Sequence, residues 1–395
     1  MAEIRPTTGV HLVGSVPLSS AEEVFKTACK ELPGRLKSVP DGETSARDNY
    51  IVWQKDRFPE EARRKLPFAD GVDLPADHPG FTADSIKPTG YDDAALASYK
   101  KFADLKTQGV IPNHVRFQVC LPHPFDSIHF FLRPEYHAGL GEIYRQRMLE
   151  SVSRIISNIP ADQLAIQWDM ALLQPMIEYN IKGREPVVPK EFVTSSMAPL
   201  KEGYIAQLVP LIEIIPREVK VGIHLCYGDL NHRHLIEPED TAILTDVANT
   251  TVKMVSRPLN WVHLPVPKSR DDAAYFAPLK NLNMHKDTVL YLGLVHADDA
   301  EGTKKRIATA QAAGIRDFGV ATECGFGRTP VEQLDGILQI SRDVSAPVVA
   351  KEEEKGAAAS KESSSLQKED KEKEKEGAQQ SLRDRIARLF SSCFK

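Results

Sequence analysis

His224 and Cys226 form the sharpest chemical pattern in this sequence. They stand two residues apart in the apolar run GIHLCYG, and in an extended strand that spacing places both side chains on the same face. A shared metal ion requires such an arrangement, and zinc binds both imidazole and thiolate. Cys324 ends a later apolar run and adds a third donor. The alternative is that the cysteines are small buried apolar residues, a common role for cysteine.

Other polar residues also stand where apolar runs end. Most of them have a structural explanation: Ser15 suits a turn, Glu43 suits a helix cap, and a lone histidine is usually a hydrogen-bonded loop residue. A carboxylate that follows an apolar run, as Asp169 does, is harder to explain without a function. Their coincidence predicts a polar site built from these strand-end residues: Ser15, Glu43, His123, Asp169, His224, Cys226, His263, His296 and Cys324.

Eight apolar runs, alternating with amphipathic stretches, must position these polar residues. The runs cover residues 9–17, 35–43, 115–122, 164–171, 219–228, 259–266, 288–295 and 316–325. Strand–helix alternation at this spacing predicts parallel strands joined by right-handed crossovers. We therefore expect the α/β class, as a (β/α)8 TIM barrel with its catalytic groups at the carboxyl ends of the strands. An open doubly wound sheet is the alternative.

Helical stretches precede most of the runs. One face of a helix predicted over 141–158 carries Ile143, Met148, Val152, Ile155 and Ile156. A later helix is predicted to end at Gly314, just before the last run. No G-x-G-x-x-G or Walker loop follows a run, which disfavours nucleotide binding.

Length and charge disfavour several classes of protein. The chain has 395 residues, 42% of them hydrophobic, which is enough for a large core. A net charge of -5 disfavours nucleic-acid binding, because there is no excess of Lys and Arg to neutralise phosphates. No run approaches the roughly 20 apolar residues of a membrane span, and the first residues lack the layout of a signal peptide. The five scattered cysteines are therefore expected to be thiols or metal ligands in a cytoplasmic protein.

Composition changes near residue 346, so we expect one barrel domain over residues 1–345. The Lys- and Glu-rich stretch 346–380 predicts a disordered, charged linker. Residues 381–395 predict a short amphipathic C-terminal helix that contacts a membrane surface or a protein partner, and a frayed tail helix is the alternative. The apolar face of this helix would carry Leu382, Ile386, Leu389 and Phe390.

Five local motifs follow one another in the order of a known family. VGSVP (13–17) is similar to I-G-S-F-P, and DGETSARD (41–48) to H-G-E-P-x-R-N-D. IQWDMALL (166–173) is similar to I-Q-I-D-E-P-A-L, GIHLCYGD (222–229) to an H-x-C-Y zinc segment, and TECGFGRTP (322–330) to D-C-G-L-K-T-R. Over residues 9–345 the chain thus resembles the catalytic half of cobalamin-independent methionine synthase and its shorter relatives without the N-terminal half. The resemblance implies the barrel superfamily shared with uroporphyrinogen decarboxylase.

The resemblance implies Zn²⁺ as the cofactor, held by His224, Cys226 and Cys324. In this family the metal holds the thiol of homocysteine as a thiolate, the nucleophilic form, for methyl transfer. The family's fourth ligand is a glutamate that ends the sixth strand. An ungapped match places His263 at that position, which implies a set of two histidines and two cysteines.

The resemblance also implies how a small amino-acid-like substrate is bound. Ser15 would hold its carboxylate, and Glu43 and Asp169 its ammonium, through charge-assisted hydrogen bonds. His123 is a further candidate substrate-binding residue. Asp169 and His296 are the candidate catalytic residues.

Other segments depart from the family pattern. After Cys324, F-G-R stands in place of K-T-R, and after Asp169, Met170 and Ala171 stand in place of E-P. The segment LPHPFDSIHFF does not match the family's T-G-P-V-T. These differences disfavour methyltetrahydrofolate as the donor and a housekeeping methionine synthase as the function.

Three hypotheses follow. The first is a zinc-dependent transferase that moves a methyl or similar one-carbon group to the thiol of a small amino-acid-like substrate. The second is a cofactor-independent decarboxylase or lyase of the uroporphyrinogen decarboxylase type, in which Asp169 handles protons. The third is a barrel that has kept a ligand pocket and lost its chemistry.

Overall fold

Each of the eight predicted runs contains one strand of a parallel sheet. The computed structural model describes residues 6–66, 68–228 and 233–348. The strands are β2 (Val10–His11), β3 (Ser38–Pro40), β4 (Arg116–Pro122), β5 (Leu164–Met170), β6 (Lys220–Leu225), β7 (Trp261–Pro265), β8 (Val289–Val295) and β9 (Gly319–Thr322). They pair in the order β2-β9-β8-β7-β6-β5-β4-β3, and every pairing is parallel.

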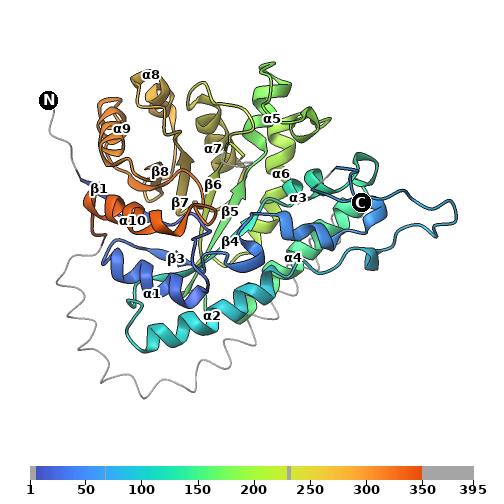
Figure 1. The fold of residues 1–395 in the computed structure, drawn as a ribbon, viewed down its shortest axis with the longest axis horizontal. Coiled ribbons are helices and arrows are strands. Elements are labelled where there is room, and N and C mark those ends of the chain that lie inside the picture. Colours follow the sequence, from blue (N-terminus) through green and yellow to red (C-terminus); the bar gives the residue numbers. More distant parts are fainter. Residues whose placement is uncertain (1–5, 67, 229–232, 349–395) are drawn as a thin grey trace.

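Backbone hydrogen bonds bridge the first and last strands of this sheet. The Val10 N–H donates to the Arg35 carbonyl at 3.0 Å, and the Val16 N–H donates to the Gly42 carbonyl at 2.9 Å. Sequential strand order and this bridging distinguish the fold from an open doubly wound sheet. The fold is a (β/α)8 TIM barrel, as predicted, with helices around the central strands (Figure 1).

Helices cover the outside of the barrel. The described residues contain α1 (Ala21–Glu31), α2 (Tyr91–Thr107), α3 (Pro124–Phe131), α4 (Leu140–Asn158), α5 (Leu173–Asn180), α6 (Leu200–Glu213), α7 (Ala242–Met254), α8 (Ala273–Phe276), α9 (Ala300–Ala312) and α10 (Leu334–Asp343). The helix predicted over 141–158 is α4, and its predicted apolar face packs on the core. The later prediction is also confirmed, since Gly314 follows α9 with a φ of +95°, which glycine adopts readily.

The connection after β3 differs from the others because it begins without an α-helix. Between β3 and α2 the chain forms four 3-10 turns, at Ser45–Arg47, Val52–Arg57, Glu60–Ala62 and Ala83–Ser85. The first part of this excursion, residues 41–50, extends from the carboxyl end of β3. It therefore reaches the end of the barrel where parallel barrels carry their sites.

One layer of polar residues spans three neighbouring strands. Asp169 of β5 pairs with His224 of β6, and His224 pairs with His263 of β7. Paired residues on adjacent strands point to the same side of a sheet. All three side chains are buried, so the strand register alone brings a carboxyl group and two imidazoles together inside the barrel.

The two ends of the described chain meet beside the barrel. β1 (Thr7–Thr8) and β10 (Ser345–Ala346) form a separate two-stranded parallel ladder. Nearly all of the predicted linker 346–380 and the whole of the predicted helix 381–395 lie outside the described residues. Within the described part of the chain, no helix is both long enough and apolar enough to cross a membrane.

Candidate functional site

Three side chains from two distant segments form a compact donor group. Nitrogen of His224 and the sulfurs of Cys226 and Cys324 lie within 4.8 Å of one another. His224 lies in β6, Cys226 follows that strand directly, and Cys324 follows β9 by two residues. The Sγ–Sγ distance of 3.8 Å is far from the roughly 2 Å of a disulfide, and both cysteines are free thiols.

The spacing of these donors fits a zinc ion. Zinc binds sulfur at about 2.3 Å and nitrogen at about 2.0–2.1 Å in a tetrahedron, which separates two sulfurs by about 3.8 Å and a sulfur from a nitrogen by about 3.6 Å. The two thiols are 3.8 Å apart, and Cys324 Sγ lies 3.6 Å from His224 Nε2. The three residues present therefore suit this metal in both chemistry and separation.

His263 does not join the donor group; it lies behind His224. Its Nε2 is 3.1 Å from the Thr322 carbonyl, and because a carbonyl only accepts, this nitrogen carries the proton. Burial, together with the nearby His224 and His11, lowers the pKa of His263 well below its usual value, so its Nδ1 is an acceptor. The His224 Nδ1–H then donates to that nitrogen at 2.7 Å, which leaves the Nε2 lone pair of His224 facing Cys324. Both nitrogens of His263 are therefore occupied, in contrast to the expected fourth ligand.

Cys324 is held close to its thiolate form. A hydrogen bond from the Cys226 thiol lowers its pKa well below the usual value, against the effect of burial, and the Arg328 charge acts in the same direction. Thiolate is the form that binds metals and attacks carbon.

A small cavity of about 60 Å³ opens beside the two thiols. Three of the predicted substrate-binding residues line it: Ser15 in the loop after β2, Glu43 in the loop after β3, and Asp169 in β5. His224, Cys226 and Cys324 line the same cavity. The structure therefore brings the predicted metal ligands, other than His263, against the residues predicted to hold an amino acid.

Glycines in the last loop allow the close approach of Ser15. The Gly327 N–H donates to Ser15 Oγ at 3.1 Å. A Cβ added at Gly325 would lie 2.5 Å from Ser15 Oγ, and one added at Gly327 would lie 2.7 Å from Ser15 Cβ. Side chains at either position would push this loop, and Cys324 with it, away from the cavity.

Both carboxyl groups in this cavity favour the uncharged, protonated form, because their pKa values are raised. Burial raises the pKa of Glu43 to about 8, although the Arg47 charge opposes the shift. Burial, and then the Glu43 charge, raise the pKa of Asp169 well above its usual value, while Gln167 Nε2 donates to Asp169 Oδ1 at 2.8 Å. An entering ammonium group would favour ionisation of both carboxyl groups and pair with them.

The loop that supplies Glu43 has a strained backbone. Glu43, Ser45 and Tyr50 are not glycines, yet their φ values are +47°, +66° and +46°. Asp41 holds the loop by accepting hydrogen bonds from Arg47 at 2.6 Å, Ser98 at 2.7 Å and the Glu43 N–H at 3.0 Å. Strain of this kind persists where surrounding contacts enforce it, and it concentrates at functional sites.

Tyr50 and Asp126 belong to the site, and sequence reasoning missed both. Tyr50 lines the small cavity and donates to Asp126 Oδ2 at 3.0 Å. The buried Asp126 also accepts from the Tyr204 hydroxyl at 2.6 Å and from the Ala171 N–H at 3.0 Å. Burial raises the pKa of Asp126 to about 7, against these hydrogen bonds. Neither residue ends a strand, and the only sequence signal was the position of Asp126 four residues after the run that ends at Pro122.

His123 lines neither the small cavity nor the larger cavity that adjoins it. Its Nδ1 accepts from the Phe125 N–H at 3.1 Å and so caps α3. Its Nε2 donates to the Tyr204 carbonyl at 2.9 Å, and its ring stacks on Tyr204. This placement differs from the expected contact with substrate, because both ring nitrogens already hold the backbone.

A larger cavity of about 400 Å³ opens on the other side of the thiols. Cys226, Cys324, Gly325 and Arg328 line both cavities, so the donor group lies where the two meet. His296, a predicted catalytic residue, lines the larger cavity, where its Nε2 donates to the Val266 carbonyl at 2.9 Å. Burial lowers the pKa of His296 to about 3, so the ring is neutral.

His234 gives the larger cavity a charged wall. Its ring lies 3.0 Å from Glu237 and 3.0 Å from the half-buried Glu323. Burial opposes ionisation, but the two carboxylates raise the pKa of His234 to about 9. Sequence reasoning missed His234, since no predicted strand ends there.

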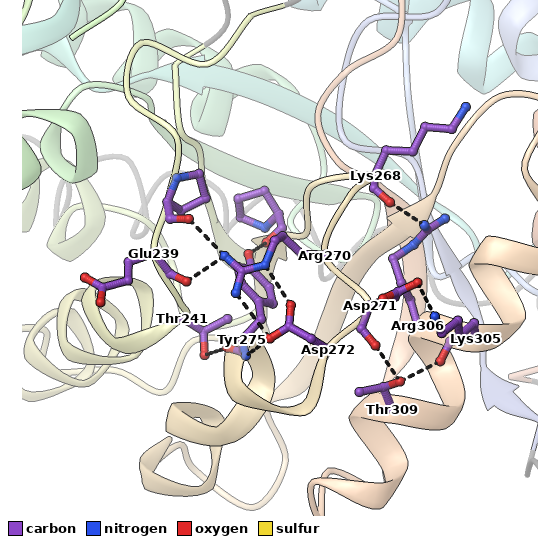
Figure 2. Close-up of polar contacts among 12 residues, drawn as sticks. Glu239, Thr241, Lys268, Arg270, Asp271, Asp272, Tyr275, Lys305, Arg306 and Thr309 are labelled. Atoms are coloured by element: carbon purple, nitrogen blue, oxygen red, sulfur yellow. Dashed lines mark hydrogen bonds and ion pairs between the residues drawn. The ribbon is translucent and has the colours of Figure 1, made fainter. Parts of the chain in front are cut away.

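The loop after β7, residues 267–272, braces the wall of the larger cavity. Figure 2 shows Arg270 donating to the Glu239 carbonyl, at 2.6 Å, and pairing with Asp272, at 2.8 Å, while Arg306 of α9 donates to the Lys268 carbonyl at 2.8 Å. The Arg270 guanidinium lies over the Tyr275 ring, and the Tyr275 hydroxyl contacts that of Tyr227. This network fixes Tyr227, which lines the cavity.

Comparisons with known proteins show a likeness among solved structures only. Neither a protein-family model nor a curated protein sequence matches the chain. A B12-independent methionine synthase from Shewanella sp. W3-18-1, solved in complex with selenomethionine, is 12% identical, with 90% of this chain and 100% of that chain covered and a TM-score of 0.49. A methyltransferase from Methanosarcina mazei is 11% identical, with 87% and 95% covered and a TM-score of 0.46. At these values the function must be inferred from the site itself.

Proposed function

We propose that this chain is a zinc-dependent transferase that moves a methyl group to the thiol of a small amino-acid-like substrate. The observation that carries the proposal is the donor group of His224, Cys226 and Cys324 placed against a cavity lined by two carboxyl groups, those of the half-buried Glu43 and the buried Asp169. Zinc, when bound, holds a substrate thiol as a thiolate at neutral pH. An aminothiol such as homocysteine would supply both a third sulfur ligand for the metal and an ammonium group for the two carboxyl groups.

The residues of the small cavity would bind the amino-acid end of the substrate. Glu43 and Asp169 line the same cavity, and too little positive charge lies near them to stabilise both as carboxylates. An ammonium group that enters the cavity would therefore form a charge-assisted hydrogen bond with each of them. Ser15 lines the same cavity beside Gly325, where its hydroxyl would contact the carboxylate. Tyr50 is held by Asp126 and would close the wall between them.

The methyl donor would enter through the larger cavity, because both cavities open onto the same thiols. In the transfer, the substrate sulfur forms a bond to the methyl carbon, and the bond between that carbon and the donor breaks. The electron pair of the broken bond stays with the donor, and the thiol proton has already left to solvent. The chain's own contribution is to align the two substrates across the donor group.

Binding of homocysteine to the zinc-loaded, full-length protein tests this proposal. We expect one-to-one binding with release of one thiol proton, measured by calorimetry in two buffers that differ in ionisation enthalpy. Binding should be lost in Cys324→Ser and retained in Cys29→Ser, a half-buried cysteine of α1 outside the donor group. Equal binding to wild-type protein and Cys324→Ser would contradict the proposal.

A metal-free lyase is the second candidate, and one observation favours it. The raised pKa of Asp169, caused by burial and then by Glu43, makes this carboxyl group a proton donor near neutral pH. Turnover of a carboxylated substrate by protein stripped of metal would support this function. Loss of that turnover in Asp169→Asn, together with its survival in Cys226→Ser, would separate the lyase from the transferase.

A further inference from the structure

A third cavity, of about 320 Å³, opens at the opposite end of the barrel. It is lined by residues at the beginnings of the strands, among them Trp261 of β7 and Arg116 of β4, and by Lys37, which directly precedes β3. The sites of parallel barrels lie at the other end, so neither the proposed transfer reaction nor its donor group explains this cavity.

The rim of this cavity carries an excess of positive charge. Within the described residues, the side chains of Lys37 and Lys220 have no hydrogen bond or ion pair, although both line the cavity. Partial desolvation, and then the Lys220 charge, lower the pKa of Lys37, whose side chain is exposed at the rim. Arg116 donates to the carbonyls of three residues and so keeps its charge at the same rim. Asp287 is the one carboxylate lining the cavity, and it cannot balance three cations.

The wall of the cavity carries the hydroxyl group of Tyr291, which opens onto the cavity. Tyr291 is 3% exposed, and its hydroxyl makes no hydrogen bond among the described residues. A ligand that enters the cavity can therefore accept a hydrogen bond from this hydroxyl. The Tyr291 ring is stacked on His11, with centroids 4.9 Å apart, and Trp261 lies next to them in the same wall. With Val10, Ala165 and Val289, they give the cavity an apolar wall that suits the apolar body of a ligand.

We propose that this cavity is a second ligand site, which binds a small dianion with an apolar body, such as an aryl phosphate or an aromatic dicarboxylate. Lys37 and Lys220 neutralise the anionic groups, and Tyr291 donates a hydrogen bond to one of them. The apolar body of the ligand lies against the wall that Trp261 and Tyr291 help to form.

Buried hydrogen bonds connect this ligand site with the other end of the barrel. His11 Nε2 lies 2.6 Å from Gln167 Oε1, and Trp261 Nε1 donates to the same oxygen at 3.2 Å. Gln167 Nε2 in turn donates to Asp169 Oδ1 at 2.8 Å. A ligand in contact with Trp261 therefore lies two hydrogen bonds from the carboxyl group of the proposed reaction.

Titration of the full-length protein with phenyl phosphate, followed by calorimetry, tests the ligand site. We expect saturable binding of one ligand per chain, at least about tenfold tighter than that of the neutral analogue phenylmethanol. Lys37→Ala and Lys220→Ala should each weaken binding about tenfold, and Tyr291→Phe about fivefold, because each removes one polar partner. Lys304→Ala, on the exposed face of α9 and paired with Glu301, should leave the affinity unchanged.

Two results would overturn the proposal. One is the absence of saturable binding. The other is equal binding to wild-type protein and to the Lys37→Ala/Lys220→Ala variant, which would locate the phosphate at Arg47 or Arg328 in the other mouth of the barrel. The lysine variants change exposed side chains, and coincident thermal unfolding curves would show that the fold is unaffected.

The anion can come from the chain itself or from a free ligand, and a further variant distinguishes the two sources. Val348 lines the cavity, and the sequence continues to Glu352, Glu353 and Glu354. Tighter binding of phenyl phosphate to the full-length variant with glutamine at these three positions would support the site and identify the chain's own carboxylates as competitors. Unchanged binding to that variant, with the dependence on Lys37 and Lys220 intact, would support a free ligand.

Discussion

Two loops flank the same mouth of the barrel, and they use charge in opposite ways. In residues 267–272 each charged side chain has a partner: Arg270 pairs with Asp272, Asp271 pairs with Lys305 (Figure 2), and Lys268 donates to the Ala297 carbonyl. In residues 41–50 the Glu43 carboxyl group has no hydrogen-bond partner among the described residues, and three residues other than glycine have positive φ. The first loop satisfies its own groups and braces a wall. The second loop holds the Glu43 carboxyl group on a strained backbone without a hydrogen-bond partner, and a ligand can supply that partner.

Removing the incompletely paired carboxyl groups should have the largest effect on substrate binding. Glu43→Gln and Asp169→Asn should together weaken homocysteine binding about 100-fold, because each removes a charge-assisted hydrogen bond to the ammonium. Calorimetry on the zinc-loaded protein measures this, and 4-mercaptobutanoate, which lacks the amino group, should bind equally to wild type and variant. If Asp272→Asn in the paired loop weakens homocysteine binding as much, the contrast between the loops fails.

Removal of His263, which accepts a hydrogen bond from His224, should weaken zinc binding without abolishing it. His263→Ala should lower zinc affinity about 10–100-fold, because His224 loses the acceptor that fixes its tautomer and orientation. His263→Gln should recover most of the affinity, since its carbonyl oxygen can accept from His224. Competition with a chromogenic chelator measures both, with exposed His285→Ala as the control. Zinc loss as complete as that of Cys226→Ser would instead make His263 a direct ligand.

A change in the bracing network should affect stability and leave the metal site intact. Arg306 is 1% exposed and donates to the Leu294 and Lys268 carbonyls and to Asp299. Arg306→Met should lower the free energy of unfolding by about 2–3 kcal/mol, measured in urea, because buried carbonyls lose their donor. Zinc affinity should stay within about twofold of wild type. A large loss of zinc would show that the two halves of the mouth are coupled.

The smallest expected effect is a pH dependence of stability in metal-free protein. The pKa of Glu43 is about 8 in the folded state and 4.5 in the reference state, so the unfolded chain releases this proton first. The contribution of Glu43 is therefore fully present below pH 4.5 and is lost as the pH rises to about 8. Urea unfolding at a series of pH values should show a weaker decline in Glu43→Gln. Identical slopes in the two proteins would contradict the raised pKa.

The barrel could be predicted from the sequence because its signals are local. Each strand is a short apolar run, and the helix faces follow a period that residues such as Met148 and Val152 reveal. The strand-end rule also predicted that Ser15, Glu43 and Asp169 would lie near the two cysteines, which they do. The H-x-C spacing also predicted that His224 and Cys226 would lie on the same face, because side chains in a strand alternate between faces.

The rest of the site depends on side-chain direction and on loops, which leave no local pattern. His123 and His263 stand at strand ends, yet one caps α3 and the other lies behind His224. Tyr50 enters the cavity from a strained loop, and it is held there by Asp126 from α3. The contact between Tyr50 and Asp126 joins residues 76 positions apart, which no local pattern in the sequence reveals.

Zinc content tests the central claim most directly. Elemental analysis of tag-free, full-length protein should find about one zinc per chain. The zinc should be lost in Cys226→Ser and retained in Cys29→Ser, because only Cys226 belongs to the donor group. Wild-type protein without zinc, or Cys226→Ser that retains it, would contradict the account and favour metal-free chemistry at Asp169.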